Sequence, residues 1–183
     1  MNIKSTSIAD YIELNYDIET IKDSKELEKV EELVINNLDY SLEQAPFYPN
    51  ELTYFTNLKK CTFMNFEITD EIINILNNLK LQVLTLDNCT CITDVKLNAE
   101  KIIIEVSRVN LETINSKDLT LIECGKIDIN KNTKKLTILN CNIKNATQLK
   151  QLKCQLIGCA LDDTTITNLE NIICNPKQYK KII

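Results

Sequence analysis

The sequence of 183 residues contains no histidine, only two glycines and only three prolines. Without histidine, the chain lacks the commonest general base near neutral pH and every Ser-His or Cys-His nucleophile pair. The scarcity of glycine and proline argues against a turn-rich β-sandwich and against a glycine-rich loop that cradles phosphate. The adjacent acids Asp70/Glu71 and Asp162/Asp163 are expected to be solvated caps or turns. We therefore expect no catalytic residues and no enzymatic activity.

The sequence also lacks a long apolar run, since no window approaches the roughly 18 apolar residues of a membrane span. The amino terminus shows no apolar signal segment, so we expect a cytoplasmic chain with reduced cysteines. Zinc sites usually need paired CxxC spacings or histidine, and the nearest approach is Cys89-Thr90-Cys91. The eight cysteines are therefore interpreted as small buried residues, with Cys91 as the most exposed, and no metal or cofactor is expected.

What the sequence does contain is a recurring pattern of cysteines. Four segments read apolar, any, apolar, any, any, Cys, and they end at Cys89, Cys124, Cys141 and Cys159. The last three cysteines lie 17 and 18 residues apart. Such a near-constant period is the signature of a solenoid. Because the two apolar residues are two apart, they point to one face of a strand, and stacked units predict a parallel sheet with a continuous core behind it.

The pattern divides the chain into units that each contribute one inward-facing pair. Eight units are predicted to start at Val30, Leu58, Leu81, Lys101, Ser116, Thr133, Gln151 and Leu169. Their inward pairs are Leu33/Ile35, Cys61/Phe63, Leu84/Leu86, Ile104/Val106, Leu119/Leu121, Leu136/Ile138, Cys154/Leu156 and Ile172/Cys174. A weaker unit at Ala9, with the pair Ile12/Leu14, precedes them. The cysteines of the last units are expected to mark the inner corner of each coil.

Two stretches resemble the leucine-rich-repeat family in its cysteine-containing form. Residues 81–94 carry Leu84, Leu86, Cys89 and Ile92-Thr93-Asp94, and residues 58–70 match with Cys61, Phe63, Phe66 and Ile68-Thr69-Asp70. The resemblance implies an α/β solenoid, a leucine-rich-repeat-like arc with a parallel β-sheet on its concave face and helices on its convex side. The last four unit spacings, 15, 17, 18 and 18, are shorter than the family's usual 20–29. We therefore expect convex helices only in the N-terminal half and short extended turns in the C-terminal half, for which a parallel β-helix is the alternative.

No linker divides the chain, so residues 1–183 are predicted to form a single solenoid domain. Residues 1–29 form an N-terminal cap or a degenerate first repeat, residues 30–175 about eight repeats, and residues 176–183 a C-terminal cap or tail. Apolar spacing predicts a helix over residues 70–78 with Thr69 as its N-cap. The cover of the N-terminal end is predicted to come from Tyr11, Ile12, Tyr16, Ile18 and Ile21.

The outward strand positions give the first candidate site. Three consecutive units place Ile122, Leu139 and Ile157 in an outward row that continues upstream through Ser107, and Ile103 lies beside this row. An exposed apolar strip of this kind marks a partner site, so these four isoleucine and leucine residues are predicted to bind another protein, whose identity is unknown. The alternative is that the C-terminal tail folds over the strip. The leading hypothesis is a non-catalytic protein–protein interaction module or scaffold.

Charge gives the second candidate site. Residues 1–92 carry a net charge of −9 and residues 93–183 a net charge of +4, within a total of −5. The basic half offers Lys134, Lys135, Lys150 and Lys153 as contacts for an anionic partner, which makes a peripheral RNA- or ribosome-associated subunit the second hypothesis. Nine of the ten aromatic residues precede residue 67, so the basic half lacks a platform for stacking bases, and a merely solvated lysine face remains an alternative.

A substrate receptor of the F-box type is a third hypothesis, because cysteine-containing repeats are common in that class. Residues 1–29 are too short for an F-box, so this hypothesis rests on analogy alone. Neither a membrane nor a small-molecule substrate is expected among the partners.

Overall fold

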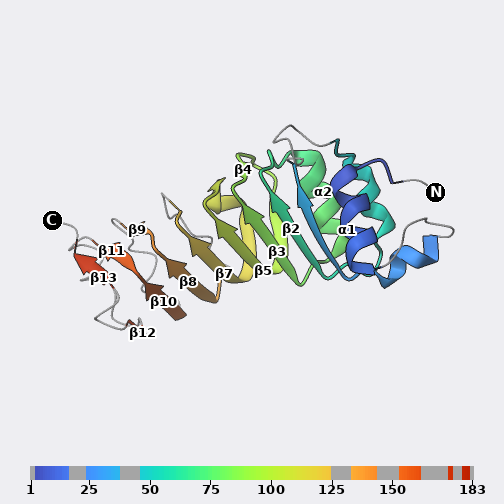
Figure 1. Cartoon of the computed structure of the whole chain (residues 1–183). Helices are drawn as coiled ribbons and strands as arrows, with labels where there is room; N and C mark the ends of the chain where they lie inside the picture. Colours follow the sequence, from blue (N-terminus) through green and yellow to red (C-terminus); the bar gives the residue numbers. More distant parts are fainter. Residues whose placement is uncertain are drawn as a thin grey trace.

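The computed structural model describes residues 3–16, 24–37, 46–124, 133–143, 153–161, 173–174 and 179–181. Its principal feature is an eight-stranded sheet whose strands all pair in parallel and follow one another in chain order, so the predicted solenoid is confirmed. Figure 1 shows the strands side by side along the molecule, with both α-helices at the N-terminal end. The sheet consists of β1 (Glu32–Asn36), β2 (Lys60–Met64), β3 (Val83–Asp87), β5 (Leu97–Glu105), β7 (Ile114–Ile122), β8 (Lys135–Leu139), β10 (Lys153–Ile157) and β12 (Ile173–Cys174).

One face of this sheet forms the core. The predicted inward pairs of β1, β2, β3, β7, β8 and β10 are all buried. In β12, Cys174 lies opposite Leu156 in the register as expected, while Ile172 falls outside the described residues. Six of the eight inward pairs are thus confirmed as core.

The prediction for the unit at Lys101 is wrong by two residues. Ile102 and Ile104 are the buried pair of β5, opposite Leu84 and Leu86 of β3. Val106 lies beyond the end of the strand with 51% of its surface exposed. Ile102, Ile104 and Val106 are all apolar and share one alternation, so two different pairs fit the pattern, and the register with β3 decides between them.

The returns between the main strands carry short strands of their own. β4 (Thr90–Cys91) pairs with β6 (Arg108–Val109), and β9 (Asn142–Ile143), β11 (Cys159–Leu161) and β13 (Tyr179–Lys181) form a second parallel ladder. A single 3₁₀ turn, η3 (Leu111–Thr113), lies between β6 and β7. The described returns after β5 are therefore short and largely extended.

The N-terminal coils have longer returns. Residues 70–79 form α2 (Asp70–Leu79), as the apolar spacing predicts, and Ile72, Ile73 and Leu76 are buried. Thr69 is the N-cap, since its side chain accepts a hydrogen bond from the backbone N–H of Ile72. Two 3₁₀ helices, η1 (Ser24–Lys29) and η2 (Pro49–Tyr54), occupy other returns of this half.

The first described segment is helical and not a strand-like repeat. In α1 (Thr6–Tyr16), Ile12 is buried but Leu14 has 86% of its surface exposed, so the predicted pair Ile12/Leu14 is wrong. The helix packs against β1, with Tyr11 and Tyr16 against the core, while the predicted Ile18 and Ile21 lie outside the described residues. A residue spacing of two fits a strand, but the surrounding apolar residues at spacings of three and four favour a helix.

Two buried or half-buried side chains fix α1 in place. The carboxylate of Glu51 accepts hydrogen bonds from the backbone N–H groups of Lys4 (2.7 Å) and Ser5 (2.9 Å), directly before the helix begins. At the other end, the Tyr16 hydroxyl donates to the carbonyl of Glu32 (3.2 Å) and accepts from its N–H (3.1 Å). Since β1 is the first strand of the sheet, Tyr16 bonds to the sheet's outer edge.

A left-handed residue follows six of the main strands. Asn65, Asn88, Val106, Glu123, Asn140 and Gly158 all have positive φ, and each comes directly after the last residue of its strand. The backbone N–H of each of the first five donates to a carbonyl of the next coil at 2.9–3.0 Å. Asparagine and glycine tolerate this conformation well, whereas a β-branched residue does not. A Cβ at Gly158 would lie 2.3 Å from Asn140 Oδ1, so the exposed Asn140 side chain would have to move to accept one.

Val106 is the strained member of this series. Because its side chain is half exposed, replacing it removes little buried apolar surface. We expect Val106→Asn to raise the free energy of unfolding by about 1 kcal/mol. Glu123→Val, at the same position one coil later, should lower it. Urea denaturation followed by circular dichroism measures both, and an unchanged or reduced stability of Val106→Asn would contradict the assignment.

Candidate functional site

The outward face of the main sheet contains the predicted apolar strip. Ile122, Leu139 and Ile157 end β7, β8 and β10 and lie directly opposite one another in the parallel register. All three side chains are partly exposed. Neighbouring strands are about 4.8 Å apart, so the three side chains form one continuous apolar row.

The upstream part of the row differs from the prediction because of the shift in β5. Glu105, and not Ser107, lies opposite Ile122, and Asp87 lies opposite Glu105. Ile103 occupies the central row of the face, paired with Thr85 and Thr120. The row therefore changes from two acids to three aliphatic residues, with Ile103 diagonally beside it.

The four predicted anion contacts do not form one cluster in the described structure. Lys134 and Lys135 are both exposed, but they take different directions from the start of β8. The Lys135 ammonium pairs with Asp118 of β7 at 2.9 Å, whereas Lys134 lines a groove outside the sheet face. Lys150 and the side chain of Lys153 lie outside the described residues.

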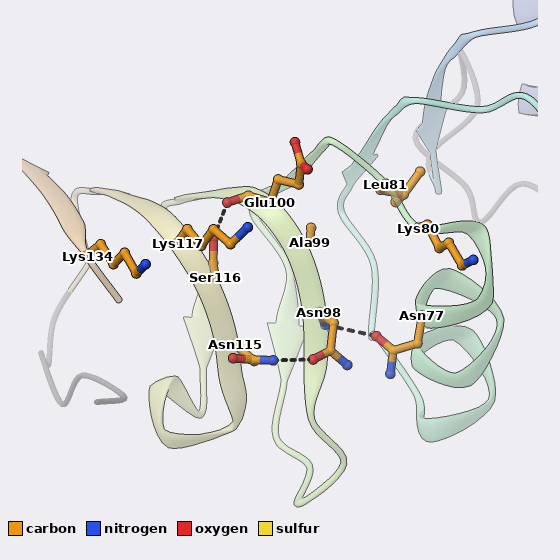
Figure 2. A pocket seen from close by; sticks show the side chains of 10 residues that line it. All are labelled: Asn77, Lys80, Leu81, Asn98, Ala99, Glu100, Asn115, Ser116, Lys117 and Lys134. Atoms are coloured by element: carbon orange, nitrogen blue, oxygen red, sulfur yellow. Dashed lines mark hydrogen bonds between the residues drawn. The ribbon is translucent and has the colours of Figure 1, made fainter. Parts of the chain in front are cut away.

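The groove lined by Lys134 is an open depression of about 520 Å³ at the side where the main strands begin. Figure 2 shows its lining, which comes from the end of α2, from β5 and β7, and from the segment leading into β8. The residues are Asn77, Lys80, Leu81, Asn98, Ala99, Glu100, Asn115, Ser116, Lys117 and Lys134. The sequence does not single out this site, because its lysines belong to three separate segments.

Side-chain amides form the floor of the groove. Asn77 Oδ1 accepts from the backbone N–H of Asn98 (2.8 Å), and Asn98 Oδ1 accepts from Asn115 Nδ2 (2.5 Å). Beside them, the buried Ser116 hydroxyl is within hydrogen-bond distance of the carbonyls of Glu100 and Asp118. These bonds tie α2, β5 and β7 together and give the groove a rigid polar base (Figure 2).

The cysteines form a ladder on the core side of the left-handed turns. Cys89, Cys124, Cys141 and Cys159 are buried, and each thiol is within hydrogen-bond distance of a carbonyl two residues earlier and of another in the preceding coil. Cys141 Sγ additionally accepts from the backbone N–H of Cys124 at 3.2 Å. The ladder cysteines thus satisfy backbone groups at the corner of each coil.

Ser107 is the member of this ladder that the cysteine pattern misses. Its hydroxyl accepts from the backbone N–H of Cys89 (2.8 Å) and lies near the carbonyls of Leu86 (3.1 Å) and Glu105 (2.6 Å). These are the contacts that cysteine makes in the later coils. With Ser107 included, the intervals along the ladder from Cys89 to Cys159 are 18, 17, 17 and 18 residues.

The seven cysteines whose side chains are described are free of disulfides and buried. The sequence predicts Cys91 as the most exposed cysteine, but this is wrong, because Cys91 faces the core from β4 with none of its surface exposed. Burial raises the pKa of Cys91 to about 11 and also raises the pKa of Cys61 and Cys89. A protonated, buried thiol is a poor nucleophile, so these side chains contribute to packing. Within the described residues, no group of three or more Cys, Asp or Glu is arranged to hold a metal ion.

The ladder predicts that Ser107 needs a side chain that can accept a hydrogen bond. Ser107→Ala removes the partner of the Cys89 N–H and should lower the free energy of unfolding by roughly 1–3 kcal/mol. Ser107→Cys restores the group found in the other coils and should retain most of the stability. Urea denaturation of both variants tests this, and equal losses would contradict the role of the ladder.

Buried thiols also predict a dependence of stability on alkaline pH. The pKa of Cys91 is about 11 in the fold against an ordinary value of 9.0. A pKa raised by folding gives stability that is present below pH 9 and is lost as the pH rises through 11. The loss from this thiol alone should reach roughly 2–3 kcal/mol. In urea denaturation from pH 8 to 11, Cys91→Ala should show a shallower decline than the unmodified chain, and parallel profiles would contradict this prediction.

None of the helices in the described ranges is long and apolar enough to cross a membrane. Comparison of the chain with protein-family models, with curated proteins and with solved structures finds no match. The candidate sites therefore stand on their own geometry: an apolar row at the ends of β7, β8 and β10, and a lysine-lined groove at the beginnings of β5 and β7.

Proposed function

We propose that this chain is a non-catalytic interaction module that binds another protein through the outward face of its main sheet. The observation that supports this is the row Ile122–Leu139–Ile157, in which three aliphatic side chains lie opposite one another on a strand face. Contiguous apolar side chains on a surface mark interaction sites, whereas single ones do not. The regularly spaced strand face of a solenoid suits this use, because it offers an extended contact area.

The charges next to the row favour a particular kind of partner surface. Asp87 and Glu105 extend the same row toward the N-terminus. In the described part of the chain, neither carboxylate has an ion-pair partner within 4 Å. A partner with an apolar ridge and one or two cationic side chains beside it would bury the aliphatic row and pair with both acids. Complementary charges of this kind set the orientation of a partner more than its affinity.

The leucine-rich-repeat interpretation belongs to the same proposal. It is supported by the N-terminal coils, where α2 follows β2 and begins at the N-cap Thr69 in a segment that resembles the family's cysteine-containing form. In this interpretation the sheet forms the concave side of an arc and α2 its convex side. The partner would then lie in the concavity, and the module would act as a cytoplasmic scaffold.

Charge substitution on the row tests the proposal. The triple variant Ile122→Asp, Leu139→Asp and Ile157→Asp should bind its partner at least tenfold more weakly, because the contact would bury three unpaired carboxylates. The partner is first isolated by native co-purification and identified, and its affinity is then measured with both purified proteins by calorimetry.

A matched control separates loss of the site from a general effect of charge. Val34→Asp with Thr62→Asp adds carboxylates to the same outward face, but on β1 and β2. Circular dichroism must show native structure in both variants. Retention of full affinity by a folded triple variant would refute the proposed function.

A further inference from the structure

The groove carries a positive charge that its own acidic residue does not neutralise. Lys80, Lys117 and Lys134 line it and are all exposed, and Glu100 is its one acidic lining residue. None of these four residues makes an ion pair with another described residue. In Figure 2 the Glu100 carboxylate points away from the asparagines of the floor.

Two of these lysines are stacked on each other in neighbouring coils. Lys134 donates its backbone N–H to the carbonyl of Lys117 at 3.0 Å, so their side chains leave adjacent points of the sheet edge. Like charges placed opposite each other in a sheet are destabilising. Other lysines at the starts of strands have acids across from them: Lys59 pairs with Glu31, Lys60 with Glu32 and Lys135 with Asp118. The Lys117–Lys134 stack breaks this pattern at the mouth of the groove.

The remaining walls complete a site for an anion. Lys80 is the C-cap of α2 and lines the groove on the side opposite Lys117 and Lys134, but its ammonium points away from the depression, whereas those of Lys117 and Lys134 point toward it (Figure 2). The floor between them is a hydrogen-bonded set of asparagine side chains, which fixes the positions of all three walls. The volume of about 520 Å³ falls in the range of small-ligand sites.

We propose that this groove binds a small ligand that carries two or more linked phosphate groups. Lysine binds phosphate as a point charge, and phosphates between Lys117 and Lys134 would relieve their mutual repulsion. The lining has no aromatic side chain, so the phosphates themselves are the recognised part of the ligand. This phosphate site is distinct from the apolar row, which lies at the opposite ends of the same strands.

A nucleic-acid backbone fits this groove less well. A strand of RNA needs a continuous basic track and gains much of its affinity from stacking on aromatic side chains. Here Glu100 lines the groove together with the lysines, and Asp118 lies opposite Lys135. Two adjacent lysines that point into one depression match a compact polyanion instead.

The experiment uses the full chain and inorganic triphosphate as the probe. We expect triphosphate to raise the melting temperature in a concentration-dependent manner and to give a saturable binding isotherm by calorimetry. Lys117→Gln with Lys134→Gln should weaken this binding by about tenfold or more. Lys29→Gln removes an exposed lysine of η1, far from the groove in sequence, and should leave the affinity unchanged.

A charge reversal distinguishes a ligand site from an ordinary lysine surface. Lys134→Glu places a carboxylate opposite Lys117, so the unliganded protein should melt roughly 1–3 °C higher while its response to triphosphate is lost. Absence of saturable triphosphate binding to the unmodified chain would overturn the proposal. So would unchanged affinity in the double variant, or a single-stranded RNA oligomer that binds more tightly than triphosphate through the same lysines.

Discussion

The left-handed residue that follows each main strand from β2 to β10 fixes the geometry of the coils. From β2 to β8, the N–H group of this residue bonds to the next coil, and the residue after it turns its side chain toward the core, as Cys89 and Ser107 do. Because the same turn recurs, the strands stay in register, the apolar pairs stack into one core, and the outward positions form straight rows. A slip of one residue would move Ile122 into the core and a core leucine onto the surface. Both candidate sites therefore depend on this turn.

Charge is organised across the strands as well as along the chain. Three of the main strands, β2, β8 and β10, begin with Lys60, Lys135 and Lys153, and β3 and β5 end with the acids Asp87 and Glu105. The groove lies at the edge of the sheet where the strands begin, and the aliphatic row lies at the edge where they end. Four residues of extended chain lie between Lys117 and Ile122, so the two sites are about 16 Å apart along the strand. A phosphate ligand and a protein partner could thus occupy the same coils together, and neither would have to displace the other.

The sequence predicts the core of the later coils well because cysteine marks their phase: Leu119/Leu121 and Leu136/Ile138 are buried as expected. It fails at β5, where Ile102/Ile104 and Ile104/Val106 both fit the apolar pattern and Ser107 replaces the cysteine that would have decided the phase. The row Ile122–Leu139–Ile157 follows from the cysteine spacing, whereas its acidic continuation through Glu105 needs the observed register. The groove could not be predicted, since Lys80 is 37 residues before Lys117 and reaches it only through the packing of α2 beside β5.

The contact between Tyr16 and Glu32 bears on how copies of this molecule behave at high concentration. An open edge strand can accept a strand from another molecule, and a solenoid whose coils are alike could then polymerise end to end. One phenol group occupies both the N–H and the carbonyl of Glu32 on the outer side of β1. Both of these groups are therefore already hydrogen-bonded, and α1 packs against β1, so they are not available to a strand from another molecule. Tyr16 therefore protects the N-terminal end of the solenoid against fibre growth, a task separate from any ligand that the sheet binds.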